Sequence, residues 1–253
     1  MRADWAPLRR MLATLRREDH MLPLWWRDDD AIEPTPALDK LLALSKRLEM
    51  PVHLAVIPAN AAPELAAFTR EHTSLIPLAH GWRHHNNAPA AVKKSEFGTP
   101  RPEGVHELHQ SQNRMRLLFG TSYVPMFVPP WNRIDASFLP ALADAGYKGL
   151  STFTHRLLPD AAPGLRQINT HIDPIGWRST RGLKDPDALI GETVALLQAR
   201  LDGTQDATEP LGYLTHHLVH TPEVWDFSET FLTELLEGGA KVQPIAPLLE
   251  TPG

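Results

Sequence analysis

Two histidines and three aspartates are of the right types to hold a divalent metal ion. His80 and His84 are separated by three residues, and a triplet of carboxylates, Asp28, Asp29 and Asp30, precedes them in the chain. Imidazole nitrogen and carboxylate oxygen are both zinc ligands, and three protein ligands leave a fourth position for the water that metal-assisted hydrolysis needs. These residue types therefore predict a hydrolytic metal site.

The spacing of the two histidines is weak evidence by itself. It also occurs on the helices of zinc proteases, in which a glutamate directly after the first histidine is the base. Gly81 occupies that position here, so the protease interpretation lacks its catalytic group. Residues 74–79 form a short apolar run, which is typical of a buried strand. His80 is then expected where a strand ends, although an isolated pair of this kind is more often a pair of structural histidines.

The aspartate triplet favours the metal site over structural histidines. It follows a second apolar run, residues 22–26, and Arg27. A helix that starts near Thr35 would explain one aspartate as an N-terminal group. Three adjacent carboxylates repel one another, however, and a bound cation or Arg27 is expected to compensate their charge.

Length and composition are those of one α/β domain. The chain has 253 residues, 42% of them hydrophobic, and no linker-like boundary divides it. We therefore expect a single domain over 1–253, with an N-terminal helix within 1–20 and the motifs between 22 and 244. The sequence has no cysteine, which excludes disulfides and thiolate metal sites, so any metal must be held by His, Asp and Glu.

Charge and hydropathy limit the partners and the location. The net charge is −5 and no block of Lys and Arg is present, which argues against nucleic acid as a partner. Residues 1–20 mix arginines with acidic residues and lack the apolar stretch of a signal peptide. No apolar run is long enough to span a bilayer. A cytoplasmic location is expected, and the sequence carries no information on oligomeric state.

Helical and strand patterns alternate along the chain, which predicts a parallel sheet covered by helices. In barrels of this class the chemistry lies at the C-terminal ends of the strands. The aspartate triplet, His80, residues 129–133 and the late histidines all fall at such ends. A polar loop over 86–102 is expected either to close over the site or to be a surface excursion. The helices are expected at 5–17, 37–48, 63–71, 103–118, 137–145, 188–201 and 224–236, and the strands at 22–27, 52–57, 74–79, 126–128, 149–153, 167–170 and 211–215.

In this order the motifs resemble those of the polysaccharide deacetylases of carbohydrate esterase family 4, also called the NodB-homology domain. The resemblance extends from about residue 22 to residue 244 and implies a distorted (β/α) barrel that uses a divalent metal. The run from Arg27 to Asp30 resembles an Arg-x-Asp-Asp variant of the first motif. This implies Asp29 as the catalytic base and Asp30 as a metal ligand, whereas a register one residue earlier gives these roles to Asp28 and Asp29.

The second motif of the family is a His-x-x-x-His sequence, which implies His80 and His84 as the other metal ligands. The third motif, Arg-Pro-Pro-aromatic-Gly, resembles residues 128–132. Val128 replaces the arginine that orients the base, so the resemblance leaves Arg27 or Arg133 to take over that role. The residues expected to bind substrate are Trp131, Asn132, Arg133 and Trp177.

Two later motifs concern the general acid. Residues 173–177 resemble the fourth motif, with Gly176 in place of its second aspartate. Leu214-Thr215-His216 resembles the fifth motif and implies His216 as the general acid, with His217 as the alternate. Trp82, Trp131 and Trp177 either stack on a sugar ring or pack in the barrel mouth.

The function implied by the resemblance is that of a metal-dependent hydrolase. It would remove an N-acetyl or O-acetyl group from a small acetylated saccharide or sugar conjugate. Zinc is the expected metal, with Co²⁺, Ni²⁺ and Mn²⁺ as alternatives. Two other functions stay open, namely hydrolysis of a non-sugar C–N amide bond on the same fold, and a catalytically silent carbohydrate-binding relative.

Overall fold

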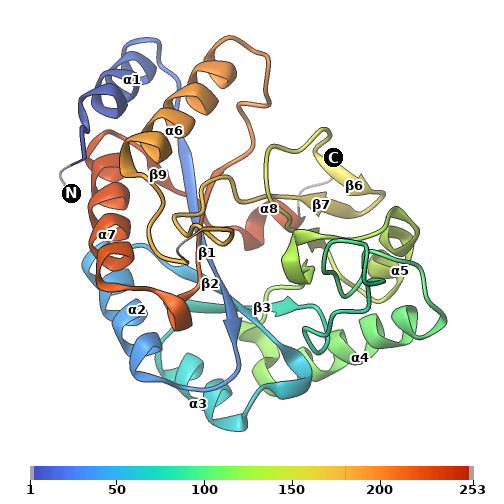
Figure 1. Cartoon of the computed structure of the whole chain (residues 1–253). Coiled ribbons are helices and arrows are strands. Elements are labelled where there is room, and N and C mark those ends of the chain that lie inside the picture. Colours follow the sequence, from blue (N-terminus) through green and yellow to red (C-terminus); the bar gives the residue numbers. More distant parts are fainter. Residues whose placement is uncertain (1–2, 180, 251–253) are drawn as a thin grey trace.

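The computed structural model describes residues 3–179 and 181–250, and its strands form one sheet. The strand order is β6-β7-β5-β4-β3-β2-β1-β8, with β9 also paired to β1 (Figure 1). Every pairing between these strands is parallel except β6 with β7. The strands are β1 (Pro23–Ala31), β2 (Val52–Val56), β3 (Leu75–His80), β4 (Met126–Val128), β5 (Gly149–Leu150), β6 (Asp160–Ala162), β7 (Leu165–Gln167), β8 (Leu211–Thr215) and β9 (Lys241–Val242).

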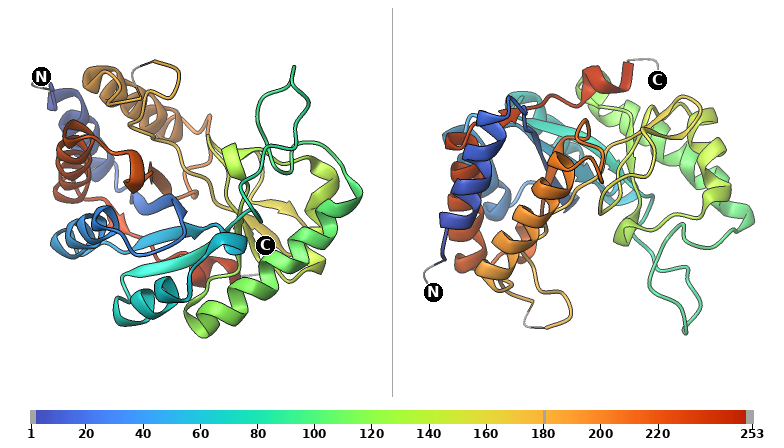
Figure 2. Two further views of the ribbon diagram at one scale, coloured as in Figure 1. Left: turned by 60° about the horizontal axis from the view of Figure 1, so that its bottom comes forward. Right: turned by 90° about the horizontal axis from the view of Figure 1, so that it is seen from above.

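Helices lie around the outside of the sheet (Figures 1 and 2). Their apolar faces explain this position: in α1 the buried residues are Leu8, Met11, Leu12 and Leu15, which share one helical face. The helix starts are set locally, since the Thr35 side chain accepts the Leu38 N–H at the start of α2. The helices are α1 (Ala6–Arg17), α2 (Pro36–Arg47), α3 (Pro63–Glu71), α4 (Pro102–Phe119), α5 (Leu139–Asp144), α6 (Pro186–Leu201), α7 (Pro222–Glu237) and α8 (Ala246–Glu250).

An irregular segment, residues 168–172, joins the two ends of the sheet. Thr170 N–H donates to the Thr152 carbonyl beyond β5. One residue on, His171 N–H donates to the Gly212 carbonyl of β8, and Leu214 N–H donates back to the Ile172 carbonyl. These bonds bring the β5 and β8 sides together, which confirms the predicted distorted (β/α) barrel.

The predicted elements are found, with differences where strands are short or irregular. β1 continues to Ala31, so the aspartate triplet lies inside the strand and not after it. The predicted strand 149–153 keeps only its first two residues, and the predicted strand 167–170 overlaps β7 only at Gln167. The predicted helix 137–145 begins as a 3₁₀ turn before α5. The sequence did not predict β6, β9 or α8, because elements of two to five residues show no periodicity. Within the described residues, no helix has the length and apolar character needed to cross a membrane.

Gly212 allows β8 to approach the closing segment, which gives a prediction on stability. A Cβ atom at Gly212 would lie 2.5 Å from the Asn169 carbonyl oxygen and 2.6 Å from Trp25 Nε1. We expect Gly212→Ala to lower the free energy of unfolding by about 1–3 kcal/mol, the usual cost of overpacking. Urea denaturation measures this value.

The control is Gly191→Ala in α6, where no heavy atom outside the helix lies within 4 Å of the added Cβ. Alanine has the higher helix propensity, so this variant should be more stable by up to about 1 kcal/mol. Equal effects of the two substitutions would show that the close approach at Gly212 does not matter.

Candidate metal and catalytic site

A bulge in β1 turns two adjacent aspartates into the same cavity. Neighbouring strand residues normally point to opposite faces. In the pairing of β1 with β2, three residue steps from Asp28 to Ala31 match only two steps on the partner strand, and Asp30 has a positive φ of 77°. The extra residue re-aims Asp30. Asp29 and Asp30 therefore both line the cavity at the C-terminal end of the barrel.

Asp30, His80 and His84 place three potential ligand atoms together. Asp30 Oδ1 lies 3.1 Å from His80 Nε2 and 3.3 Å from His84 Nε2. His80 Nδ1 is 3.0 Å from the Val128 carbonyl oxygen, which can only accept, so Nδ1 carries the proton and Nε2 of the neutral ring has a free electron pair. Asp30 Oδ1 is buried and accepts no hydrogen bond within the described structure.

This donor set fits a divalent metal ion. Free electron pairs of nitrogen and oxygen face each other across about 3 Å, which is unfavourable unless a cation lies among them. Two ligand atoms bound to one tetrahedral zinc ion at about 2.0–2.1 Å would be roughly 3.3 Å apart, close to the distances seen here. Among the described residues no other group of three or more His, Asp or Glu has such an arrangement.

The charges in the cluster prepare the ligands for a cation. Burial opposes ionisation of Asp30, but the neighbouring His80 outweighs it and lowers the pKa of Asp30. Burial, together with His80, lowers the pKa of His84, which favours the neutral ring that metal binding requires. Burial disfavours the charged form of His80, yet Asp29 and Asp30 overcome this and raise its pKa. In the absence of a metal the cluster therefore attracts a proton.

Arg27 holds Asp29 at the floor of the cavity. The guanidinium is fully buried, and it donates from Nε to Asp29 Oδ1 (2.8 Å) and from Nη2 to Asp29 Oδ2 (3.0 Å). Nη2 also donates to Asn132 Oδ1 at 2.7 Å, and Nη1 donates to Ser151 Oγ at 2.7 Å. The carboxylate is thus fixed in orientation by a two-point contact.

These contacts decide between the two arginines that could replace the arginine missing at Val128. Arg27 contacts Asp29, whereas the Arg133 guanidinium forms no hydrogen bond to Asp29 and donates to the Lys94 carbonyl. The sequence did not indicate that Asn132 and Ser151 would support Arg27, since neither belongs to a charged motif.

His216 lies next to Asp29 in the wall of the cavity. Its Nε2 atom is 3.9 Å from Asp29 Oδ2. The Trp177 ring meets the His216 ring edge to face, with centroids 4.7 Å apart. Trp177 is itself fixed, because its Nε1 donates to Asp173 Oδ2 at 2.7 Å. Gly176, which replaces an aspartate of the family motif, is buried beside this pair.

Asp28 and His217 lie outside the cavity. Asp28 has no exposed surface, and it accepts hydrogen bonds from Thr215 Oγ1 (2.6 Å) and from the His217 N–H (3.0 Å). His217 Nδ1 also pairs with Asp28 Oδ1. The two residues that served as alternates thus pair with each other in the layer outside the barrel, and the shifted register gains no support from the structure.

The cavity has a volume of about 840 Å³ and brings together all the other expected site residues. Trp82 does not line it. Strained backbone gathers here: of the eight non-glycine residues with positive φ in the described structure, Asp30, His84, Trp131, Asn132 and Thr154 line this cavity. Strain of this kind is retained where function requires it. The expected residues in the wall are Asp29, Asp30, His80, His84, Trp131, Asn132, Arg133, Trp177 and His216.

The loop over 86–102 does not close over the cavity. It projects from the barrel (Figure 2), and none of its residues, all of which are described, lines the cavity. Arg101 pairs with Glu107 on α4. The loop has another use, because Glu96 is buried and its carboxylate accepts the N–H groups of Trp82 (3.0 Å) and Arg83 (2.7 Å).

Glu96 therefore fixes the segment between His80 and His84. His85 N–H is a third, longer donor to it at 3.5 Å. Gly81 permits this approach, since a Cβ atom there would collide with the Glu96 carboxylate. The sequence showed only an acidic residue in a polar loop, and nothing in its spacing connected Glu96 with His84.

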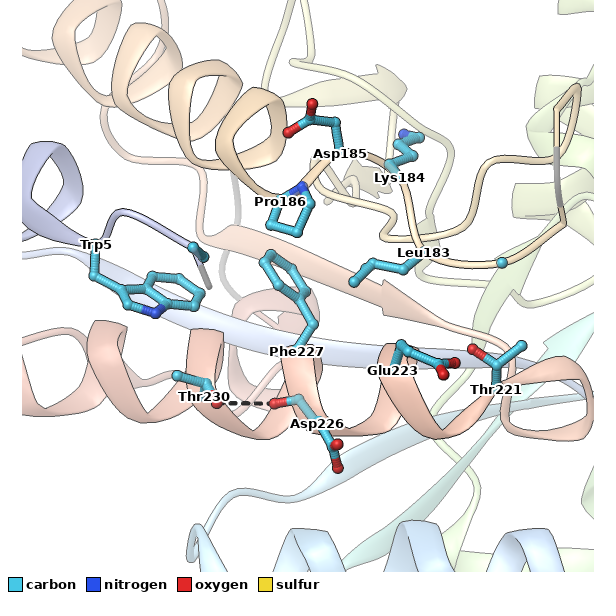
Figure 3. A pocket seen from close by; sticks show the side chains of 12 residues that line it. Trp5, Leu183, Lys184, Asp185, Pro186, Thr221, Glu223, Asp226, Phe227 and Thr230 are labelled. Atoms are coloured by element: carbon cyan, nitrogen blue, oxygen red, sulfur yellow. Dashed lines mark hydrogen bonds between the residues drawn. The ribbon is translucent and has the colours of Figure 1, made fainter. Parts of the chain in front are cut away.

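A second cavity, of about 810 Å³, lies between the N-terminal segment, residues 182–186 and α7 (Figure 3). Trp5, Leu183 and Phe227 form its apolar part, and Glu223 and Asp226 stand on the α7 side. No histidine lines it. None of Asp30, His80 and His84 lines it.

The sequence of the chain matches no family model and no curated protein. A family 4 carbohydrate esterase from Streptomyces lividans, solved with acetate, is similar in structure: TM-score 0.54, 14% identity, covering 89% of this chain and 93% of that chain. A polysaccharide deacetylase from Bacillus cereus gives a TM-score of 0.53 at 17% identity, covering 88% and 91%. A pseudoenzyme of family CE4 from Bacillus anthracis gives 0.57 at 15%, covering 91% and 66%.

These likenesses confirm the predicted resemblance at the level of the fold. An enzyme and a pseudoenzyme share this fold, so the fold does not determine the activity. The activity has to be argued from the site.

Metal content tests the cluster. We expect roughly one divalent ion per chain in the wild type, with zinc preferred, and a large loss of zinc in His84→Ala. His85→Ala is the control, because His85 is an exposed neighbour outside the cluster. Elemental analysis measures zinc, and chelator treatment should lower the melting temperature of the wild type but not that of His84→Ala. Equal zinc in the two variants would refute the cluster as the site.

Glu96 should control metal affinity without binding the metal. In Glu96→Gln an amide NH₂ replaces one acceptor and faces backbone N–H donors, so we expect zinc affinity to fall by about 10- to 100-fold. Competition with a fluorescent chelator measures this. Glu103→Gln, at an exposed position on α4, is the matched control. An unchanged zinc affinity in Glu96→Gln would show that the loop is not required to position His84.

Proposed function

We propose that this protein is a metal-dependent deacetylase that hydrolyses the N-acetyl group of a small amino sugar or sugar conjugate. One observation carries the proposal: the cluster of Asp30, His80 and His84 opens into the same cavity as Asp29, held by Arg27, and His216. A metal site, a carboxylate and an imidazole in one cavity are the groups that amide hydrolysis needs.

The roles follow from the contacts of each side chain. A divalent metal held by Asp30, His80 and His84 would polarise the acetyl carbonyl and acidify water. Asp29 would accept the proton of the attacking water, because Arg27 fixes its orientation toward the cavity. His216 would donate a proton to the departing amine nitrogen, since it lines the same cavity and its Nε2 lies 3.9 Å from Asp29 Oδ2.

Two tryptophans support a sugar as the substrate. Trp177 is 44% exposed, and its hydrogen bond to Asp173 keeps its ring in the wall of the cavity. The Trp131 ring lies tilted against the His84 ring, with ring centroids 4.3 Å apart. Exposed aromatic faces suit the apolar face of a sugar ring. The cavity volume of about 840 Å³ is within the range of sites that enclose small molecules.

The substrate is tested by a screen that measures free acetate and new primary amine together. We expect release from N-acetylated monosaccharides and short conjugates, and little from chitin-like or peptidoglycan polymers. Cyclic amides and simple N-acetyl amines belong in the same screen. Turnover of these compounds alone would favour a non-sugar amide hydrolase, and sugar binding without any turnover would identify a silent relative.

The role of Asp29 is tested by Asp29→Asn. The amide keeps the shape but cannot take the water proton, so turnover should fall by about 10²- to 10⁴-fold while zinc stays bound. Arg27 then lacks its buried counter-charge, and we expect the free energy of unfolding to fall by about 3–5 kcal/mol. Turnover is therefore measured per folded molecule, below the transition seen by circular dichroism.

Asp28→Asn is the matched control for the register of the triplet. Asp28 pairs with His217 outside the cavity, so this variant should lose stability but less turnover than Asp29→Asn. If Asp29→Asn instead loses its zinc, and Asp28→Asn keeps zinc without activity, the assignment is one residue too late in the sequence.

A further inference from the structure

Three basic side chains line the mouth of the catalytic cavity: Arg133, Arg178 and Lys184. They come from two separate parts of the chain. Arg133 follows β4, while Arg178 and Lys184 belong to the segment that leads to α6. Arg133 and Lys184 are half-buried and Arg178 is exposed. Their convergence on one cavity is therefore a product of the barrel and not of sequence proximity.

None of these three cations forms an ion pair within the described residues. Within the described residues, the only hydrogen bond of the Arg133 side chain goes to a neutral group, the Lys94 carbonyl. Surface arginines often find a carboxylate nearby, as Arg47 does with Glu229. Half-buried cations without a counter-ion are costly, because they lose hydration and gain no partner.

The acidic residues that line the cavity already have other partners. Asp29 is neutralised by Arg27, and Asp30 belongs to the metal cluster. Asp173 accepts from the Trp177 ring N–H and from the backbone N–H of Ile175. With a divalent ion in the cluster, the mouth has an excess of positive charge. A cavity with low-dielectric walls concentrates such a field on whatever enters it.

We propose that the substrate carries an anionic group, a phosphate or a carboxylate, in addition to its N-acetyl group. Arg178 and Lys184 would bind this group on the side of the cavity that carries Trp177, and Arg133 would face it from the other wall. Arginine suits such groups because its planar donors match their oxygens. The N-acetyl part of this inference rests on the proposed deacetylation, while the anionic part rests on the three cations alone.

The experiment compares matched substrates on the zinc-loaded protein. The neutral probe is N-acetylglucosamine, and the anionic probes are its 6-phosphate, its 1-phosphate and the corresponding uronic acid. We expect kcat/KM for at least one anionic probe to exceed that of the neutral probe by about tenfold or more, a preference that should weaken as salt rises. Comparison of the three anionic probes distinguishes phosphate from carboxylate and locates the charge on the sugar.

Charge-neutralising variants assign the preference to the cavity mouth. Arg178→Gln and Lys184→Gln should each raise KM for the anionic probe by about three- to tenfold and leave the neutral probe unchanged. Arg181→Gln is the control, since Arg181 is an exposed arginine in the same segment that does not line the cavity. Equal kcat/KM for neutral and anionic probes, or an equal effect of all three variants, would overturn the inference.

A binding measurement separates this inference from the proposed function. Calorimetry with N-acetylglucosamine 6-phosphate is performed before and after chelator treatment, because phosphate held by the cations survives loss of the metal. If no probe is hydrolysed but binding persists and weakens in Arg178→Gln and Lys184→Gln, the deacetylase proposal fails and the anionic ligand stands. If the phosphate probe does not bind, or if its binding is lost entirely with the metal, the inference fails.

Discussion

The site depends on a guanidinium buried at the centre of the barrel. A charged group in this position is tolerated only if its donors are paired. Arg27 meets this condition through the Asp29 carboxylate, the side chains of Asn132 and Ser151, and nearby carbonyls of the β5 end. The same bonds that satisfy the arginine also connect β1 to the chain beyond β4 and β5. Arg27 therefore both orients the proposed base, Asp29, and holds the strands at this end of the barrel together.

Irregular backbone conformation determines the geometry of the site as much as the identity of its side chains does. A regular β1 strand would send Asp30 to the outer face together with Asp28, and Asp30 would not meet His80 and His84. The bulge prevents this, and the left-handed conformations of Asp30 and His84 complete the geometry. Asn132 reaches Arg27 from a left-handed conformation as well. The hydrogen-bonded barrel supplies the energy that keeps these residues in place.

Much of this arrangement could be predicted from the sequence, and the reasons for the remainder are physical. Apolar periodicity located the long helices and the strands β1, β2, β3 and β8, and the ordered motifs brought nine expected residues into one cavity. Asn132 lines the cavity, and its hydrogen bond with Arg27 was not predicted, because a neutral side chain shows no preference in the sequence for a buried cation. The partnership of Glu96 with the backbone between His80 and His84 was hidden for a similar reason: backbone N–H groups are the same in every residue. The bulge in β1 and the closing segment 168–172 also leave no periodic signal.

A comparison of motifs alone would therefore misjudge this chain. Val128 takes the place of the arginine expected to orient the base, and by that criterion the site is defective. The structure shows an arginine that reaches the carboxylate from within the same strand, two residues away, with Asn132 closing the contact from the β4 side. The arginine stands at another position in the sequence, but its two-point contact with the Asp29 carboxylate is present. In this chain the Asp29 carboxylate, the His216 imidazole and the candidate metal cluster line one cavity, which is the arrangement that the proposed hydrolysis requires.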